Sequence, residues 1–171
     1  MADTGVRIEV KIRGDLTPFE KALHRLYAIR WTDMHNEIGS GLRNLALDRF
    51  KAGKGPDGTP WEPSGRVKAI AAASKAARNR KRGKTLIETG RLRASIHWQA
   101  DPSGVAVGTD VKYAAIHQFG GETGSRRGRF DMIARPYLGV TKDGQLADED
   151  RSLVEKIVER HLQAALAGRS A

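Results

Sequence analysis

The sequence predicts an α+β fold in which a small, mainly antiparallel sheet packs against two long helices. Apolar and polar residues alternate near the N-terminus and again around residues 95–108, a period typical of half-buried strands. Apolar residues recur three or four positions apart over about residues 17–50 and 146–166, which is typical of amphipathic helices. Long Gly/Pro-rich loops separate these segments. We expect a single domain over residues 1–171.

The N-terminal part predicts a strand followed by a long helix. The inward-facing residues of the strand are Val6, Ile8, Val10 and Ile12. Thr17 is expected to cap the helix, with Pro18 in its first turn and Glu20 completing a capping box. The helix is expected to continue for about thirty residues along one apolar stripe, with a kink at residues 39–41.

The composition changes at residues 52–84, which we expect to form an extended arm. Residues 52–65 contain three prolines and four glycines, which exclude regular structure, and Trp61 is expected to pin this loop to the core. Residues 66–82 have Ala-rich helical propensity but few large apolar side chains. We therefore expect this basic helix to be loosely held or ordered by a partner.

Short elements follow the arm. Thr89 is expected to cap a short helix, and residues 95–99 and 105–108 are expected to pair as a hairpin. Residues 112–119 predict another short helix, which carries Tyr113 and Phe119.

The next segment, residues 120–133, is expected to be a second extended loop. Four glycines lie within residues 120–131, and this stretch is expected to be irregular. Residues 134–140 are a short apolar stretch with an extended entry, because Pro136 disfavours a helical conformation in the residue before it.

The positive charge is concentrated in one quarter of the chain. The net charge is +10, and residues 51–93 hold 12 basic against 3 acidic side chains, whereas residues 94–171 hold 10 of each. A local excess of this kind favours a phosphate backbone or an acidic protein surface as neighbour. Three interpretations stay open: a solvated basic face, sequence-independent contact with DNA, and docking on an acidic protein ring.

Several classes of protein are excluded by composition. The chain has no Cys, which excludes disulfides, thiol nucleophiles and zinc–cysteine sites. The charged N-terminus lacks the apolar region of a secretory signal, and no apolar run approaches the ~18 residues of a membrane span. We therefore expect a soluble protein with no membrane contact.

Motifs for catalysis are lacking as well. The five His residues match no zinc spacing, and no Gly-x-Ser-x-Gly elbow is present. Glu37, Glu62 and Glu88 have no His partner in a motif, and we expect them to be surface carboxylates. No enzymatic activity, metal or cofactor is expected.

Four sequence blocks, in a fixed order, resemble a known family. They are Gly-Pro-Asp-Gly-Thr-Pro-Trp at 55–61, Leu-Ile-Glu-Thr-Gly-Arg-Leu-Arg-Ala-Ser-Ile at 86–96, Val-Gly-Thr-Asp with Tyr-Ala-Ala-Ile-His-Gln-Phe-Gly-Gly within 107–121, and Ile-Ala-Arg-Pro-Tyr-Leu-Gly at 133–139. With these blocks the chain resembles the phage virion morphogenesis family, the tail completion proteins of Mu-like and related tailed bacteriophages. The chain departs from the pattern at Ile133, where many members have Pro.

The resemblance implies a structural role at the head–tail junction of the virion, after assembly in the host cytoplasm. Subunits of this kind form a homo-oligomeric ring, expected to be a hexamer, that ends the tail tube and joins it to the head connector. The implied partners are other copies of the chain, tail tube and head-connector proteins, and genomic DNA in the channel through non-specific contact. The resemblance implies no reaction and no cofactor. A sequence-independent DNA-binding accessory protein is the first alternative, and a small hydrolase is the second.

The candidate site residues form two sets. Basic residues expected to face DNA or a neighbouring protein are Arg66, Lys68, Lys75, Arg78, Arg80, Lys81, Arg82, Lys84, Arg126, Arg127 and Arg129. Residues of the family motifs with expected structural roles are Trp61, Thr89, Gly90, Leu92, Tyr113, His117, Phe119, Gly120, Arg135 and Pro136.

Specific roles are expected for some of these residues. Aromatic anchors that hold loops on the core are expected at Trp61, Tyr113, Phe119 and Tyr137. His117 is expected to hydrogen-bond the glycine-rich loop beside it, and Arg135 to be a buried or inter-subunit ion-pair partner. The loops at 53–65 and 120–131 are expected to form contacts between subunits.

Overall fold

The computed structural model describes residues 14–73, 83–125, 128–141 and 143–168. The predicted strand at residues 6–12 lies outside these ranges. The described elements are α1 (Thr17–Tyr27), α2 (Trp31–Ala52), α3 (Gly65–Ala72), α5 (Arg91–Ala94), β1 (His97–Asp101), β2 (Gly104–Gly108), α6 (Ala114–Phe119), β3 (Gly121–Ser125), β4 (Gly128–Met132) and α7 (Asp148–Leu166). The α+β class is confirmed.

The helix predicted over residues 17–50 is two helices, because the chain breaks at residues 28–30. α2 continues without interruption through residues 39–41, where the kink is predicted. The glycines there serve packing. A side chain at Gly39 would collide with Trp98 of β1, and one at Gly41 would collide with Leu153 of α7.

The start of α1 also differs from the prediction. Leu16 occupies the capping position, and no side chain caps the helix there. The carboxylate of Asp15 accepts a hydrogen bond from the backbone N–H of Thr17 at 2.9 Å. Thr17 is therefore the first residue of the helix and not its cap.

The strands form two separate antiparallel pairs instead of one sheet. The predicted hairpin of β1 and β2 is confirmed, with Trp98 opposite Val107. The expectation that residues 120–131 are irregular is wrong, because β3 and β4 form a second hairpin with Thr123 opposite Phe130. The glycines in this stretch interrupt the alternation of apolar and polar side chains that is typical of a strand.

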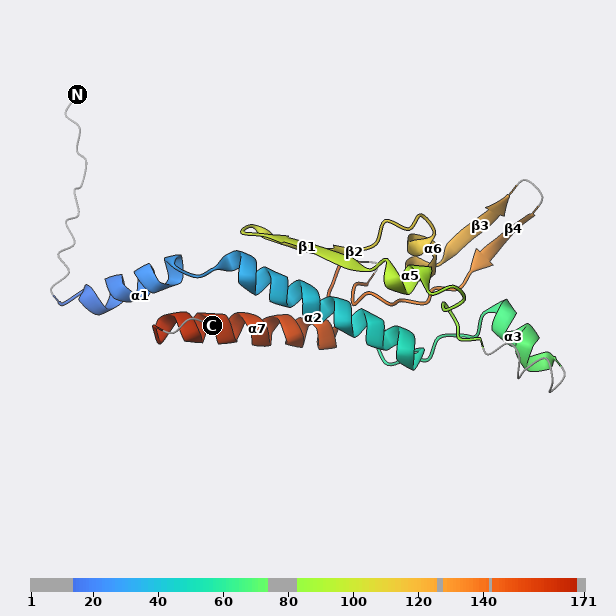
Figure 1. Cartoon of the computed structure of the whole chain (residues 1–171), viewed down its shortest axis with the longest axis horizontal. Helices are drawn as coiled ribbons and strands as arrows, with labels where there is room; N and C mark the ends of the chain where they lie inside the picture. The colour runs from blue at the N-terminus through green and yellow to red at the C-terminus, as the bar shows by residue number, and fades with distance from the viewer. Residues whose placement is uncertain (1–13, 74–82, 126–127, 142, 169–171) are drawn as a thin grey trace, which may run out of the picture.

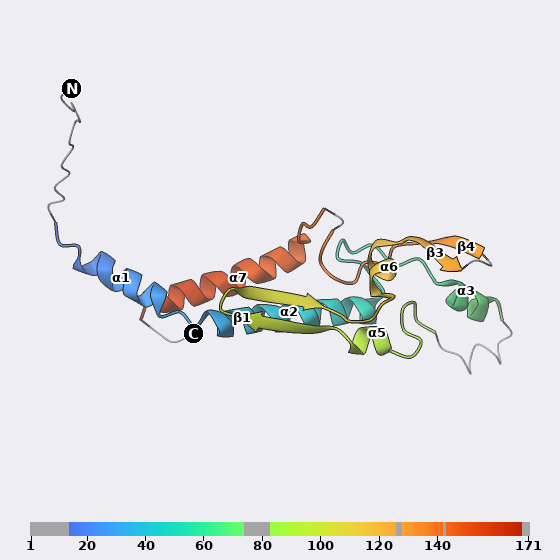
Figure 2. The same cartoon turned by 90° about the horizontal axis from the view of Figure 1, so that it is seen from above.

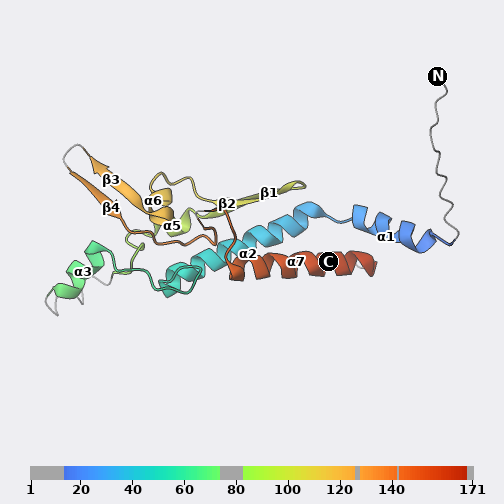
Figure 3. The ribbon, with the colours of Figure 1, turned by 180° about the vertical axis from the view of Figure 1, so that it is seen from behind.

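The layers are built around α2. The β1–β2 hairpin lies along one side of α2, and α7 lies along another (Figures 1 and 2). Met34 and Ile38 of α2 are buried against Ile157 of α7. The molecule is elongated, with α1 at one end and α3 and the β3–β4 hairpin at the other, as the view from behind also shows (Figure 3).

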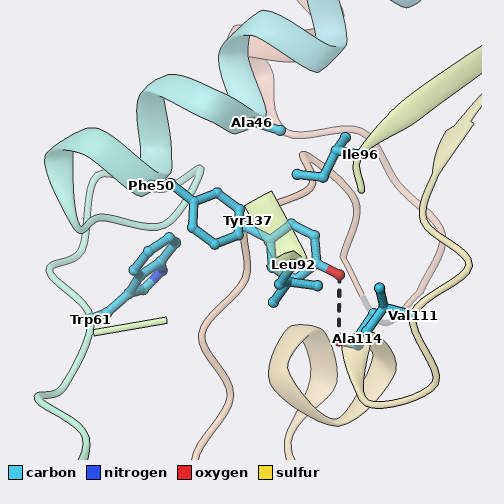
Figure 4. Close-up of a cluster of buried hydrophobic side chains, with 8 residues drawn as sticks. All are labelled: Ala46, Phe50, Trp61, Leu92, Ile96, Val111, Ala114 and Tyr137. Carbon is cyan, nitrogen blue, oxygen red and sulfur yellow. Dashed lines mark hydrogen bonds between the residues drawn. The ribbon is translucent and has the colours of Figure 1, made fainter. Parts of the chain in front are cut away.

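A second buried cluster lies at the C-terminal end of α2. It contains Ala46, Phe50, Trp61, Leu92, Ile96, Val111, Ala114 and Tyr137 (Figure 4). These residues come from α2, from the arm, from α5 and the residue after Ser95, from the region of α6, and from the segment after Pro136. The cluster therefore joins parts of the chain that are far apart in the sequence. Among the described helices, none combines the length and the apolar character needed to cross a membrane.

Candidate interaction site

The first and fourth motif blocks are joined by Trp61. Its indole N–H donates a hydrogen bond to the backbone carbonyl of Pro136 at 3.0 Å, and its ring packs edge-to-face on Phe50 at a centroid distance of 5.5 Å. Trp61 is 7% exposed. The Pro-rich loop at residues 53–65 is thus attached to the core through this side chain, in the position expected for an anchor.

The third and fourth blocks are joined by Gln118, which the sequence analysis did not single out. Its side-chain oxygen accepts hydrogen bonds from the backbone N–H groups of Tyr137 and Leu138 at 2.9 and 3.0 Å. Its side-chain nitrogen donates to the carbonyls of Leu138 and Val140, both at 3.1 Å. One amide therefore fixes the extended segment after Pro136 and satisfies its buried backbone.

Tyr137 completes this connection from the other side. Its hydroxyl donates a hydrogen bond to the carbonyl of Ala114 at 3.4 Å (Figure 4), and its ring lies 5.2 Å from that of Phe50. Burial raises the pKa of Tyr137 to about 12. The hydroxyl therefore stays protonated and remains a donor at physiological pH.

The second block contributes Leu92 to the core. Gly90, not Thr89, is the capping residue of α5, so the expected capping role of Thr89 is wrong. The Thr89 hydroxyl accepts a weaker hydrogen bond from the backbone N–H of Arg91 at 3.3 Å. All four blocks thus meet in the buried cluster at the C-terminal end of α2.

A buried ion pair connects this region to α7. Arg49 of α2 donates to both carboxylate oxygens of Asp150, at 3.1 Å to Oδ1 and more closely to Oδ2, and it also contacts Glu149 at 3.0 Å. Asp150 is 2% exposed. This pair is not predicted from the sequence, although an Arg on the apolar face of a helix is a signal for a buried partner.

A cleft of ≈ 640 Å³ lies beside the motif core. The start of α3, the loop before α5, the helix α6 and strand β4 form its walls. Its lining includes the motif residues Thr89, Gly90, Leu92, Tyr113, His117 and Arg135. It also includes Arg66, Lys68 and Arg91 with Glu62, Glu88 and Asp131. Charges of both signs therefore surround an opening edged by Phe130 and Ile133.

The described basic residues of the arm make contacts within the chain. Arg66 donates to the carbonyls of Lys84 and Ile87 at 3.0 and 3.1 Å. Lys68 pairs with Glu62 at 2.5 Å, and Lys84 donates to the carbonyl of Lys51 at 3.1 Å. The two bonds of Arg66 hold α3 against residues 84–87, whereas Lys84 connects the end of the arm to the end of α2.

The other basic candidates lie on the β3–β4 hairpin or outside the described residues. Arg129 pairs with Glu122 across the β3–β4 hairpin at 3.3 Å. The remaining ones, Lys75, Arg78, Arg80, Lys81, Arg82, Arg126 and Arg127, lie outside the described residues.

Three expectations about motif residues need correction. Tyr113 and Phe119 are exposed, so they are not buried anchors. They lie at the two ends of the short helix α6. Arg135 is buried, but its guanidinium donates to the carbonyls of Glu62 at 2.8 Å and Ile133 at 3.2 Å. Within the subunit, carbonyls are therefore its hydrogen-bond partners in place of a carboxylate, and the alternative of an inter-subunit ion pair stays a prediction.

His117 also differs from the expectation. Its Nδ1 is buried and has no hydrogen-bond partner in the described part of the chain, whereas its backbone carbonyl accepts from the N–H of Arg135 at 2.7 Å. Its ring packs edge-to-face with Tyr113 at 5.8 Å. The backbone of His117, and not its ring, makes the connection to the fourth block.

Stability is expected to depend on pH through His117. Burial, and secondly the positive charge of Arg135, lower the pKa of His117 below its ordinary value of 6.5. The unfolded chain therefore binds the proton at a higher pH than the folded chain, so the free energy of unfolding falls as the pH falls from 6.5 towards the lower folded pKa. His117→Gln should flatten this dependence in urea titrations, while His24→Gln on exposed α1 should keep it. An unchanged slope in His117→Gln would contradict the assignment.

Gly120, between α6 and β3, is expected to tolerate no side chain. Its φ is +67°, and a Cβ would lie 2.7 Å from the carbonyl oxygen of Met132 and 2.8 Å from the nitrogen of Ala134. Gly120→Ala should lower the free energy of unfolding by ~1–3 kcal/mol through backbone strain, with a further loss from these contacts. At Gly144, φ is +75° but no atom lies within 4 Å. Urea unfolding should show a clearly smaller loss for Gly144→Ala, and equal losses would contradict the steric argument.

Comparisons with known proteins cover the whole of this region. The family model described as phage virion morphogenesis family matches residues 15–163. Tail completion protein S of Escherichia phage P2 is 30% identical over 133 residues, which are 74% of this chain and 81% of that protein. Mu-like prophage FluMu G protein 2 of Haemophilus influenzae is 47% identical over 62 residues, 36% of this chain and 44% of that protein. No solved structure matches the chain.

Proposed function

Because this chain belongs to the phage virion morphogenesis family, we propose that it is a structural protein that completes a bacteriophage tail and joins it to the head. The observation that carries this proposal is the similarity to a protein named for tail completion, 81% of whose length is covered. The family match extends over residues 15–163 and so includes the motif core, the cleft, α2 and most of α7.

The arrangement of the motif residues supports a structural role. The polar side chains of Trp61, Gln118 and Arg135 donate hydrogen bonds to main-chain carbonyls, so their chemistry is used to hold loops together. Among the described residues, no group of three or more His, Asp or Glu side chains could hold a metal ion. We propose that the chain catalyses no reaction.

We further propose that the protein acts as a ring, a hexamer by the family resemblance, at the head-proximal end of the tail tube. A ring of identical subunits needs two unlike surfaces on each subunit. The projecting β3–β4 hairpin and the loop at residues 53–65 are proposed to take part in these contacts. Tail tube and head-connector proteins would lie on the two faces of the ring, after assembly in the host cytoplasm.

Removal of the gene tests this function. Host cells carrying a prophage without the gene should accumulate filled heads and separate tails in electron micrographs of the lysate. A plasmid copy of the wild-type gene should restore joined, infectious particles. Joined particles at normal yield in the absence of the gene would contradict the proposal.

The basic segment is proposed to dock on an acidic protein neighbour and not on DNA. Arg66, Lys68 and Lys84 are already engaged within the chain, so the other basic residues of the segment would carry the docking. Reversal of Arg78, Arg80, Lys81 and Arg82 to Glu should leave heads and tails unjoined, whereas reversal of exposed Lys156 on α7 should have no effect.

Other outcomes for the charge-reversal variant, and DNA binding by the free wild-type protein, would favour the alternative roles of the basic segment. Complete virions that retain or eject DNA poorly would place the segment against DNA. Salt-dependent binding of DNA by the free protein would favour the DNA-binding accessory protein. Normal infectious particles from the variant would indicate that the segment is only a solvated basic surface.

A further inference from the structure

The exposed large apolar side chains of the described residues gather at the two opposite ends of the molecule. The α1 patch consists of Leu16, Phe19, Leu23, Tyr27, Trp31 and Leu166. The cleft patch consists of Tyr113, Phe130 and Ile133, which line the cleft. In the described part of the chain, only Phe119 and Leu146 are exposed outside both patches. α1 lies at one end of the long axis, and α6 and the β3–β4 hairpin lie towards the other end (Figures 1 and 3).

The α1 helix lacks the packing that a short helix requires. It has 11 residues and none of them is buried, although isolated helices shorter than ~12–15 residues are marginal in water. Ala22, Leu26 and Ile29 are half-buried, and Arg25 donates to the carbonyl of Leu166 at 2.7 Å. The other face remains open, with Phe19 62% and Tyr27 84% exposed. No residue in the described ranges covers that face, and a surface of another subunit can do so.

At the opposite end, a two-stranded hairpin lacks further strands among the described residues, and a cleft is open. An isolated two-stranded hairpin is at best marginally stable in water, and the β3–β4 hairpin projects from the molecule with Phe130 57% exposed. The cleft of ≈ 640 Å³ opens beside it. Its charged lining has both signs, with Arg66 and Arg91 beside Glu88 and Asp131. A nucleic acid requires a basic surface, so this mixed lining suits a protein segment that also carries both charges.

We propose that α1 of one copy docks in the cleft beside the β3–β4 hairpin of the next copy. The occupant fits on chemical grounds, because α1 carries Phe19 and Leu23 on one side and Glu20 and Lys21, of opposite charge, on its polar side. Its length is roughly 16 Å at 1.5 Å per residue, which is short enough for a local docking site. Because the two patches are unlike and lie at opposite ends, the contact is head-to-tail, and repeated copies of it can close into a ring. Only the closure into a ring rests on the proposed function.

Disulfide cross-linking of the purified full chain tests this contact. The chain has no Cys, so no other thiol reacts. The double variant with Phe19→Cys and Phe130→Cys should form a ladder of covalent oligomers under mild oxidation, and reducing agent should return it to monomer. Each single variant should remain monomeric. Covalent dimers of Phe19→Cys alone would overturn the proposal in favour of a symmetric α1–α1 contact, and absence of a ladder from the double variant would overturn it outright.

Charged substitutions give an independent measurement. Phe19→Glu and Phe130→Glu should each lose self-association in sedimentation experiments, and a mixture of the two should form 1:1 dimers but nothing larger, because one intact contact remains. Leu146→Glu, outside both patches, should associate as the wild type does. Self-association that survives both single substitutions would overturn the docking site. Absence of the wild-type chain from purified virions would instead contradict the proposed function. Failure of the docking proposal and failure of the proposed function therefore give different results.

Discussion

Arg49→Ala is expected to lower the free energy of unfolding by ~3–5 kcal/mol, because removal of one partner leaves a buried charge without compensation. Asp150 is 2% exposed and accepts from Arg49 through both oxygens. The exposed pair of Arg160 and Glu37 is the matched control, since it also links α2 to α7. Arg160→Ala should cost no more than ~1 kcal/mol. Urea unfolding measures both changes.

Replacement of both partners distinguishes the contribution of the charge pair from that of side-chain packing. A double variant with Arg49→Met and Asp150→Leu should recover much of the loss, because apolar residues of similar volume often replace a buried ion pair at little cost. A loss in Arg49→Ala as small as that in Arg160→Ala would show that the pair is not buried in solution.

Trp61→Ala is expected to be the second severe substitution. Truncation of a buried aromatic residue typically costs ~3–5 kcal/mol, and the hydrogen bond from the indole to the carbonyl of Pro136 is lost as well. The expected product is insoluble or unassembled protein, since the loop at residues 53–65 loses its attachment to the core.

The control for Trp61 lies at the start of α2. Trp31 is 40% exposed, so Trp31→Ala should change the melting temperature much less than Trp61→Ala. A well-folded Trp61→Ala protein with an unchanged melting temperature would contradict the anchor role.

Elements with a strong local pattern could be predicted from the sequence. The β1–β2 hairpin and α7 follow from alternation and helical periodicity, and both lie within a few residues of their predicted bounds. The break at residues 28–30 could not be predicted, because no Gly or Pro marks it. The β3–β4 hairpin was missed because its glycines are typical of loops, although they also permit extended pairing.

The site depends on contacts that sequence spacing does not reveal. Trp61 and Leu92 are apolar residues in motifs, and their burial could be expected. The pairing of Arg49 with Asp150 spans 101 residues, and the four bonds of Gln118 depend on where the segment after Pro136 passes. Such partners are set by the tertiary arrangement and not by local propensity.

Electron cryomicroscopy of the assembled virion is the decisive experiment. We expect the layered unit of β1–β2, α2 and α7 to fit density in a closed ring at the head-proximal end of the tail tube, with each α1 against the cleft of the next subunit. Density for this chain elsewhere in the particle, or a virion without it, would overturn the proposed ring.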